Sequence, residues 1–208
     1  MRIAPEGWPF ILFAGLVLLL LGAFRFWIPF AIWLPLTVWV VAFFRDPARE
    51  GPRGERLVLA PADGKVVAVA LVEEPTFVRG PASRISIFMN VLDVHVNRYP
   101  ADGVVAYRAY NPGKFVNAAT DKASLDNEQS SVGITTPRGP LLVRQIAGLI
   151  ARRIVTDHAE GTGVRQGQRM GMIRFGSRVD LFLPPAAKVL AQVGDVTRAG
   201  LTVVAEWP

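Results

Sequence analysis

Residues 8–44 read WPFILFAGLVLLLLGAF, then Arg25, then FWIPFAIWLPLTVWVVAFF, and this stretch determines how the chain is organised. The second run, residues 26–44, has 19 residues and as a helix would span about 28 Å, close to one hydrocarbon core. The first run, residues 8–24, has 17 residues and is borderline in length. It contains no A-x-A-like cleavage site, so we do not expect a removable signal peptide.

The apolar stretch predicts a membrane anchor in one of two forms. One is a hairpin of two spanning helices with a tight turn near Arg25, and the other is one span with an interfacial or re-entrant helix. A pair of helices buried in a soluble core is the alternative. Arg45, Arg49 and Arg53 follow the stretch, and by the positive-inside rule this flank is cytoplasmic. We therefore expect an anchor over residues 1–44 in the cell (inner) membrane and a cytoplasmic body over residues 45–208.

The body is basic, and it contains few histidines that could bind a metal and no residue that carries a thiol. Only Arg2, Arg25 and Glu6 precede residue 45, so 21 of 23 basic and 16 of 17 acidic residues belong to the body, a net of +5. A basic surface suits nucleic acid, an anionic membrane or an anionic substrate, and a neighbouring anchor favours anionic lipids. The sequence has no Cys and two His, which excludes disulfide scaffolds and thiol nucleophiles and argues against a metal site.

Short β-branched runs bounded by Pro, Gly and Asp make up the rest of the body, which is typical of strands. These runs are residues 57–60, 64–70, 84–89, 103–107, 132–136, 141–146, 172–175, 179–183 and 201–205. Residues 145–154 fit either a short helix or a strand and turn. The expected fold is mainly β with minor α: an antiparallel sandwich or barrel-like body preceded by an N-terminal hydrophobic helical hairpin.

Two short segments carry candidate chemistry. Asp93-Val94-His95 follows an apolar run, and if the strand continues, alternation places Asp93 and His95 on one face. A carboxylate there would orient the imidazole and raise its basicity, whereas the plainer interpretation is a strand-end histidine without a role. The second segment holds the pair Gly176-Ser177 between two apolar runs. It fits a tight turn, and it lacks the spacing of a Gly-x-Ser-x-Gly elbow.

Taken in order along the chain, several motifs resemble the phosphatidylserine decarboxylase family, in its short prokaryotic form. They are the apolar N-terminus, APADGKV at 60–66, FMNVLDVHVNR at 88–98, NE at 127–128, QIAG at 145–148 and FGS at 175–177. The sequence departs from the family pattern at Asn90 and Val91, where the family often has Ser-Pro. It departs again at Arg98, where longer members carry a second His.

The resemblance implies that the chain makes its own cofactor. Ser177 would attack the carbonyl of Gly176, and elimination would then split the chain into a β chain, residues 1–176, and an α chain, residues 177–208. Ser177 would become a covalent pyruvoyl group, so no metal is needed. A serine hydroxyl needs a base to become a nucleophile. The resemblance implies His95 as that base and Asp63 as the residue that orients it, while on the sequence alone Asp93 is a rival.

The pyruvoyl group implied by the resemblance would form a Schiff base with the serine amine of phosphatidylserine and accept the electrons left when CO2 departs. The product would be phosphatidylethanolamine. Arg98, Arg174 and Arg178 are candidates for the phosphate or carboxylate of the substrate. The expected partners are the phosphatidylserine substrate and anionic membrane lipids, not nucleic acid, and the sequence permits a homo-oligomer without requiring one.

Two other functions remain open from the residues. A membrane-anchored serine hydrolase would use Ser177, His95 and an Asp. A barrel-sandwich adaptor tethered to the membrane would have no catalytic role. Both alternatives predict one intact chain instead of two.

Overall fold

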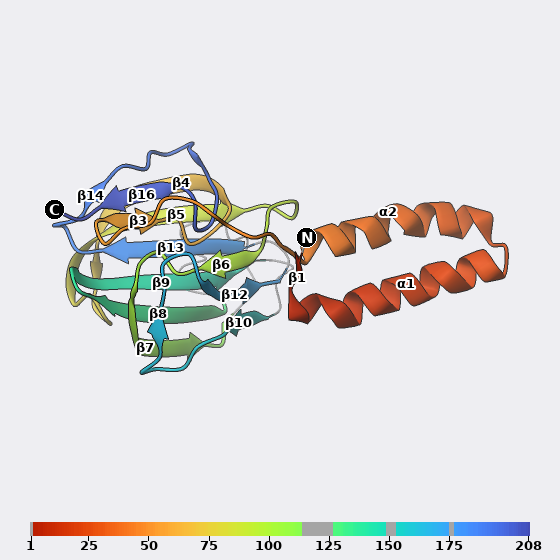
Figure 1. Ribbon diagram of the computed structural model, residues 1–208, viewed down its shortest axis with the longest axis horizontal. Coiled ribbons are helices and arrows are strands. Elements are labelled where there is room, and N and C mark those ends of the chain that lie inside the picture. The colour runs from red at the N-terminus through yellow and green to blue at the C-terminus, as the bar shows by residue number, and fades with distance from the viewer. Residues whose placement is uncertain (1, 114–126, 149–152, 175–176) are drawn as a thin grey trace. The chain divides into compact units, whose positions relative to one another are not determined.

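The computed structural model describes residues 2–113, 127–148, 153–174 and 177–208 (Figure 1). By its internal packing the chain divides into two compact units, Met1–Ala48 and Arg49–Pro208. Each unit has its own architecture, one helical and one built from strands.

The N-terminal unit is a helical hairpin. A single 3-10 turn, η1 (Pro5–Gly7), leads into α1 (Trp8–Ala23), and α2 (Trp27–Phe43) returns antiparallel to it. Arg25 occupies the connecting turn with a left-handed φ of 58°. The helices are joined by a hydrogen bond from Trp33 Nε1 to the carbonyl of Ala14 at 2.9 Å. The short strands β1 (Arg2–Ile3) and β2 (Arg45–Asp46) pair at the open end.

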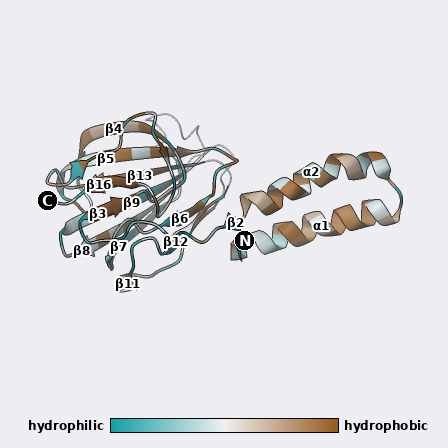
Figure 2. Cartoon of the chain, turned by 45° about the horizontal axis from the view of Figure 1, so that its top comes forward, coloured by the Kyte–Doolittle hydropathy of each residue, from teal (hydrophilic) through white to brown (hydrophobic). Residues whose placement is uncertain are grey.

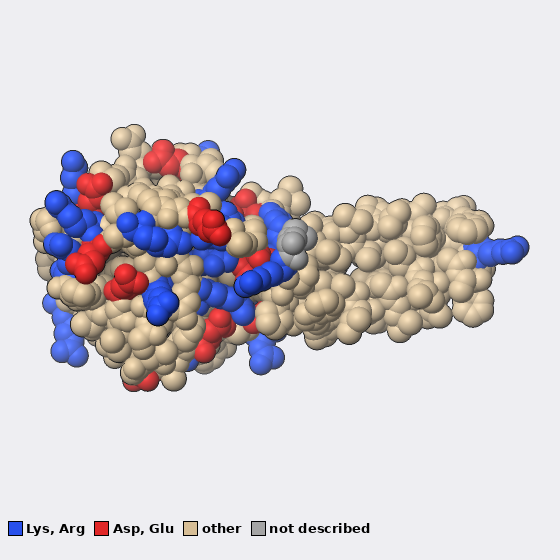
Figure 3. Space-filling model, viewed as in Figure 1, with Lys and Arg blue, Asp and Glu red and all other residues tan. Residues whose placement is uncertain are grey.

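The hairpin exposes large apolar side chains. Figure 2 shows brown, hydrophobic residues along both of its helices. Leu12 is 65% exposed and Ile28 is 76% exposed, and the space-filling view shows few charges over these helices (Figure 3). The segment Pro5–Ala23 is long and apolar enough to cross a membrane, while Trp27–Phe43 is shorter. These exposed surfaces argue against a buried soluble core pair and are compatible with membrane association. The predicted helical hairpin is confirmed.

The second unit is built on one curled antiparallel sheet, whose described strands number eight. In spatial order they are β11 (Gly163–Val164), β7 (Gly103–Asn111), β8 (Gln129–Thr136), β9 (Gly139–Ala147), β13 (Ser177–Leu183), β5 (Gly80–Met89), β4 (Gly64–Glu74) and β15 (Val196–Thr197). The predicted mainly β, antiparallel body is confirmed.

Two smaller antiparallel sheets complete the unit. One consists of β10 (Ile154–Thr156), β12 (Arg169–Ile173) and β6 (Val96–Arg98), and the other of β14 (Lys188–Val189), β16 (Val203–Glu206) and β3 (Leu57–Leu59). Both contribute to the same apolar core as the large sheet, through residues such as Ile173 and Val204. The core therefore lies between the curled sheet and the two smaller sheets.

Alternation along the central strand shows how the core is filled. Val179, Leu181 and Leu183 of β13 are fully buried in the core, which places Ser177 on the same inward face. The helix considered for residues 145–154 does not form over its described beginning. Gln145–Ala147 continue β9 as a strand, because this segment pairs with β13 on one side and β8 on the other.

Candidate active site

Ser177 opens the central strand β13 and is completely buried. Its neighbours across the ladder are Met89 of β5 and Ala147 of β9. The hydroxyl donates to Met89 Sδ at 3.3 Å, and a thioether sulfur is a weak acceptor. Among the residues that the structure describes, the hydroxyl thus makes one weak hydrogen bond, which would oppose its reaction little. Gly176, the other half of the expected cleavage site, lies outside the described residues.

His95 lies between β5 and β6, and the prediction that it belongs to a continued strand is wrong. β5 ends at Met89 because Asn90–Asp93 form a turn, in which the Asp93 N–H donates to the Asn90 carbonyl at 3.0 Å. The Asp93 carboxylate closes this turn by accepting the Asn90 N–H at 2.9 Å. The backbone carbonyl of Asp93 lies 3.1 Å from His95 Nδ1.

This contact determines which nitrogen of the imidazole can accept a proton. Donation from Nδ1 to the Asp93 carbonyl leaves the lone pair of the neutral ring on Nε2, where it can accept a proton. His95 is fully buried, and its own carbonyl accepts the N–H of Ile173 at 3.3 Å. His95 precedes Asn97 by two residues, and the Asn97 amide contacts Met89 Sδ, the same sulfur that accepts the Ser177 hydroxyl. These contacts place the histidine at the same end of the sheet as the serine.

Asp63 reaches the same end of the sheet from the other side of β5. It comes directly before β4, in which Lys65 pairs with Phe88. Gly64 permits this approach, because a Cβ at its φ of 151° would lie 2.1 Å from the Phe88 carbonyl oxygen. The structure therefore gathers the three predicted residues Ser177, His95 and Asp63 around the end of one strand.

The Asp63 carboxylate is held by two partners that the sequence did not indicate. Arg49 donates to Oδ2 at 2.7 Å and the backbone N–H of Ala199 donates to Oδ1 at 2.7 Å. Within the described parts of the chain, its recorded hydrogen bonds do not include His95, so its orienting role stays a prediction. The sequence indicates Arg49 only as a membrane-flanking charge and carries no signal for this ion pair, whose side chains are 9% and 13% exposed.

A buried network of polar side chains extends from Ser177 across the large sheet and the smaller sheet of β10, β12 and β6. Asn97 donates to Met89 Sδ at 3.7 Å, and Gln145 Nε2 donates to Asn97 Oδ1 at 2.8 Å. Thr156 then donates to Gln145 Oε1 at 3.2 Å. Asn97 and Gln145 occur in the motifs quoted above, but no role followed from the sequence. The available signal was an amide within each of these two strand segments.

The motif residues Asn127 and Glu128 support the strand beside Ser177. Asn127 Nδ2 donates to the carbonyl of Ala147 at 2.7 Å, and the Ala147 N–H donates to the carbonyl of Glu128 at 2.9 Å. Since Ala147 pairs directly with Ser177, these two bonds fix the neighbouring backbone. Asn127 and Glu128 therefore position the backbone of the strand beside Ser177.

The three predicted arginines have different surroundings. Arg98 donates to the Gly167 carbonyl at 3.0 Å, and the Arg174 N–H donates to the carbonyl of Arg153 at 3.2 Å. Arg178 makes a bidentate pair with Asp180, with both N–O distances 2.8 Å and both side chains buried.

Alternation along β13 directs Arg178 to the face opposite Ser177. The geometry therefore favours a structural role for Arg178. In the parts of the chain that the structure describes, no three His, Asp or Glu side chains form a group able to hold a metal ion.

Comparison with known proteins identifies the relatives of the chain. The sequence model of the phosphatidylserine decarboxylase family matches residues 36–205. The protein named phosphatidylserine decarboxylase proenzyme from Aromatoleum aromaticum is 48% identical over 214 residues, covering 99% of this chain and 96% of the relative. Proteins of the same name from Symbiobacterium thermophilum and Nitrosomonas eutropha are each 48% identical over 99% of this chain, covering 96% and 95% of the relatives.

Proposed function

The chain belongs to the phosphatidylserine decarboxylase family, and on that premise we propose that it converts phosphatidylserine to phosphatidylethanolamine and CO2. The observation that carries this proposal is the convergence of Ser177 and His95 at one end of the central strands, within a chain that matches its relatives almost from end to end.

We propose that the chain is a proenzyme that cleaves itself between Gly176 and Ser177. Ser177 Oγ attacks the Gly176 carbonyl carbon, the peptide C–N bond breaks, and the two residues are joined by an ester. Loss of the Ser177 α-proton with cleavage of the ester C–O bond separates residues 1–176 from residues 177–208. Residue 177 then loses ammonia by hydrolysis and carries a ketone. The buried hydroxyl, which donates to the weak acceptor Met89 Sδ, fits this role.

When formed, the pyruvoyl group supplies an electron sink for decarboxylation of the bound serine headgroup. The side chains around it supply proton transfer and shape. His95, with Nδ1 turned to the Asp93 carbonyl, uses Nε2 to take the Ser177 proton during cleavage. The same nitrogen then delivers a proton to the headgroup carbon after CO2 leaves. Asp63 and its partner Arg49 set the charge beside this end of the sheet.

We further propose that residues 1–44 anchor the enzyme in the cell membrane, with residues 45–208 on the cytoplasmic side. Support comes from the exposed apolar side chains of the hairpin and from the basic residues that follow it. An anchored enzyme meets its lipid substrate within a surface layer, which raises the effective substrate concentration.

The experiment that tests the proposed activity follows carboxyl-labelled phosphatidylserine in detergent micelles. The purified full chain should release labelled CO2 and form phosphatidylethanolamine, and Ser177→Ala should do neither. His158→Ala is the matched control, because the hydrogen bonds of the His158 side chain within the described residues are to Tyr99 and Gln168, away from Ser177. Labelling of Ser177 by a fluorophosphonate without CO2 release would support a serine hydrolase instead.

A further inference from the structure

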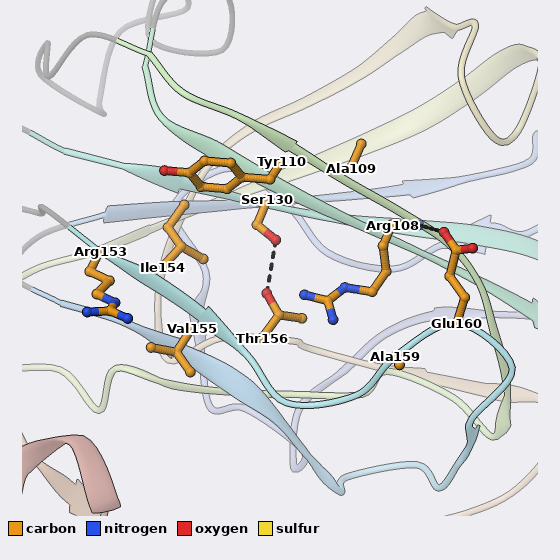
Figure 4. Close-up of a pocket in the computed structure, with 10 residues that line it drawn as sticks. All are labelled: Arg108, Ala109, Tyr110, Ser130, Arg153, Ile154, Val155, Thr156, Ala159 and Glu160. Carbon is orange, nitrogen blue, oxygen red and sulfur yellow. Dashed lines mark hydrogen bonds between the residues drawn. The ribbon is translucent and has the colours of Figure 1, made fainter.

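An open cavity of about 780 Å³ lies between the edge of the large sheet and the smaller sheet that contains β10. Figure 4 shows its wall: Arg108 and Tyr110 come from β7, Ser130 from β8, and Arg153 and Thr156 from the segment at β10. Sites for small molecules commonly measure about 300–1,000 Å³. The cavity is therefore large enough for a polar headgroup, and neither the proposed processing nor the proposed proton transfer uses it.

The cavity offers positive charge and hydroxyl groups together. Arg108 and Arg153 stand on either side of the hydrogen-bonded hydroxyls of Ser130 and Thr156, which are 2.9 Å apart (Figure 4). The guanidinium of Arg153 is exposed and makes no hydrogen bond or ion pair with the described residues. Arg108 donates from one guanidinium nitrogen, Nη1, to the carbonyl of His158 at 2.9 Å. The guanidinium has further N–H groups that can donate to a ligand.

The nearby carboxylates are already engaged. Glu160 accepts the backbone N–H of Arg108, and Glu128 accepts the Tyr110 hydroxyl at 2.9 Å. That hydrogen bond raises the pKa of the Tyr110 hydroxyl, so this hydroxyl remains protonated at neutral pH. Paired guanidinium groups beside neutral hydroxyls are the donor set that recognises phosphate oxygens.

The cavity adjoins the residues proposed for catalysis in two ways. At its rim, Ile154 pairs with Ile173, whose N–H bonds the carbonyl of His95. At its floor, Thr156 donates to Gln145, the amide that continues through Asn97 to Met89 and the Ser177 hydroxyl. A ligand in the cavity therefore lies one strand from His95.

Resting on the proposed function, we propose that this cavity binds the phosphate of the phosphoserine headgroup, with Arg108 and Arg153 as its cationic ligands and Ser130 and Thr156 as hydroxyl ligands. In that headgroup the phosphate is joined to the reacting carbon through one CH2 and one oxygen. The phosphate site must then lie beside the reacting residue without including it. The position of the cavity, next to His95 but not lined by Ser177, satisfies this requirement.

The test measures binding separately from catalysis. The full chain carrying Ser177→Ala is titrated in detergent with glycerophosphoserine, inorganic phosphate and free serine, using calorimetry. Arg108→Gln and Arg153→Gln are each added to this background, and Arg165→Gln, an exposed arginine outside the cavity, is the charge-matched control. We expect glycerophosphoserine to bind, and each cavity variant to weaken its affinity by at least about tenfold, as for other charged hydrogen bonds. The Arg165 control should leave the affinity unchanged.

Several results would overturn the proposal. They are an absence of glycerophosphoserine binding, equal weakening by Arg165→Gln, or inorganic phosphate binding as tightly as glycerophosphoserine, which would indicate a general anion site. In the cleavable background, Arg153→Gln should still yield two chains, which shows that it folds, and should raise KM more than it lowers kcat. Failure of the unmodified chain to cleave or to release CO2 would contradict the proposed function, and the binding titration would be unaffected by that failure.

Discussion

Replacing Gln145 with leucine tests whether the buried amide network holds the processing serine in place. Gln145 is fully buried, donates to Asn97 at 2.8 Å and accepts from Thr156 at 3.2 Å. Leucine fills a similar volume and has no polar atoms, so Gln145→Leu removes both bonds without opening a large cavity.

The expected magnitude follows from what each partner loses. The Thr156 hydroxyl keeps its contact with Ser130, whereas Asn97 Oδ1 loses the donor that the structure records for it. A buried polar atom left unsatisfied costs about 1–3 kcal/mol, and we expect the free energy of unfolding to fall by this amount. For a unit the size of Arg49–Pro208, each kcal/mol lowers the Tm by about 2–4 °C.

The assay is thermal unfolding of the full chain in detergent, followed by circular dichroism, with Ser177→Ala present so that every sample is one chain. Gln192→Leu, at an exposed position, is the control for the change in composition and should leave the free energy of unfolding within about 0.5 kcal/mol of the parent. With Ser177 restored, Gln145→Leu should also slow self-cleavage, because Asn97 and the serine share Met89 as a contact.

A double-mutant cycle tests whether the two amides depend on each other. Adding Asn97→Leu removes the second amide, so neither is left unpaired, and the double variant should lose less stability than the sum of the two single variants. Strict additivity, or a single-variant Tm equal to that of the parent, would show that the two amides do not depend on each other.

Three further predictions concern other parts of the molecule. His95→Ala should slow self-cleavage by about 10²- to 10⁴-fold, followed as loss of the full-length band, and a loss below tenfold would remove His95 from the mechanism. Asp180→Asn should destabilise the body by about 3–5 kcal/mol in thermal unfolding, because it leaves the buried Arg178 without its bidentate partner, and the double change Arg178→Met with Asp180→Leu should recover most of that loss. Deleting residues 1–44 should leave a chain that cleaves itself but sediments with anionic vesicles only at low salt, and persistent sedimentation at high salt would contradict the anchoring role.

The class of the fold could be predicted because its determinants are local. Apolar residues over 8–44, interrupted by a single charge at Arg25, specify the hairpin. Alternating Val179, Leu181 and Leu183 specify a strand with one face in the core. The end of β5 was missed because the apolar run continues through Leu92, while the chain is turned by a side-chain contact between Asp93 and Asn90. Local apolarity alone did not indicate this turn.

The contacts around the serine were not predictable from one sequence. Asn97 and Gln145 are 48 positions apart, and their bond depends on how the β6 and β9 sheets pack together. The pairing of Arg49 with Asp63 likewise depends on the path that the chain takes between these two residues at the start of the second unit. Sequence motifs indicated candidate residues for this site, and the fold shows which of the described ones touch.

Intact-mass measurement of the purified protein tests the central claim most directly. The chain's 22.7 kDa over 208 residues is about 109 Da per residue, so the proposed 32-residue chain 177–208 should have a mass of about 3.5 kDa. Its N-terminus should carry a ketone that a carbonyl reagent labels and that blocks Edman degradation, and Ser177→Ala should give one unlabelled full-length species. A single 22.7 kDa species in a preparation that converts phosphatidylserine to phosphatidylethanolamine would contradict the account.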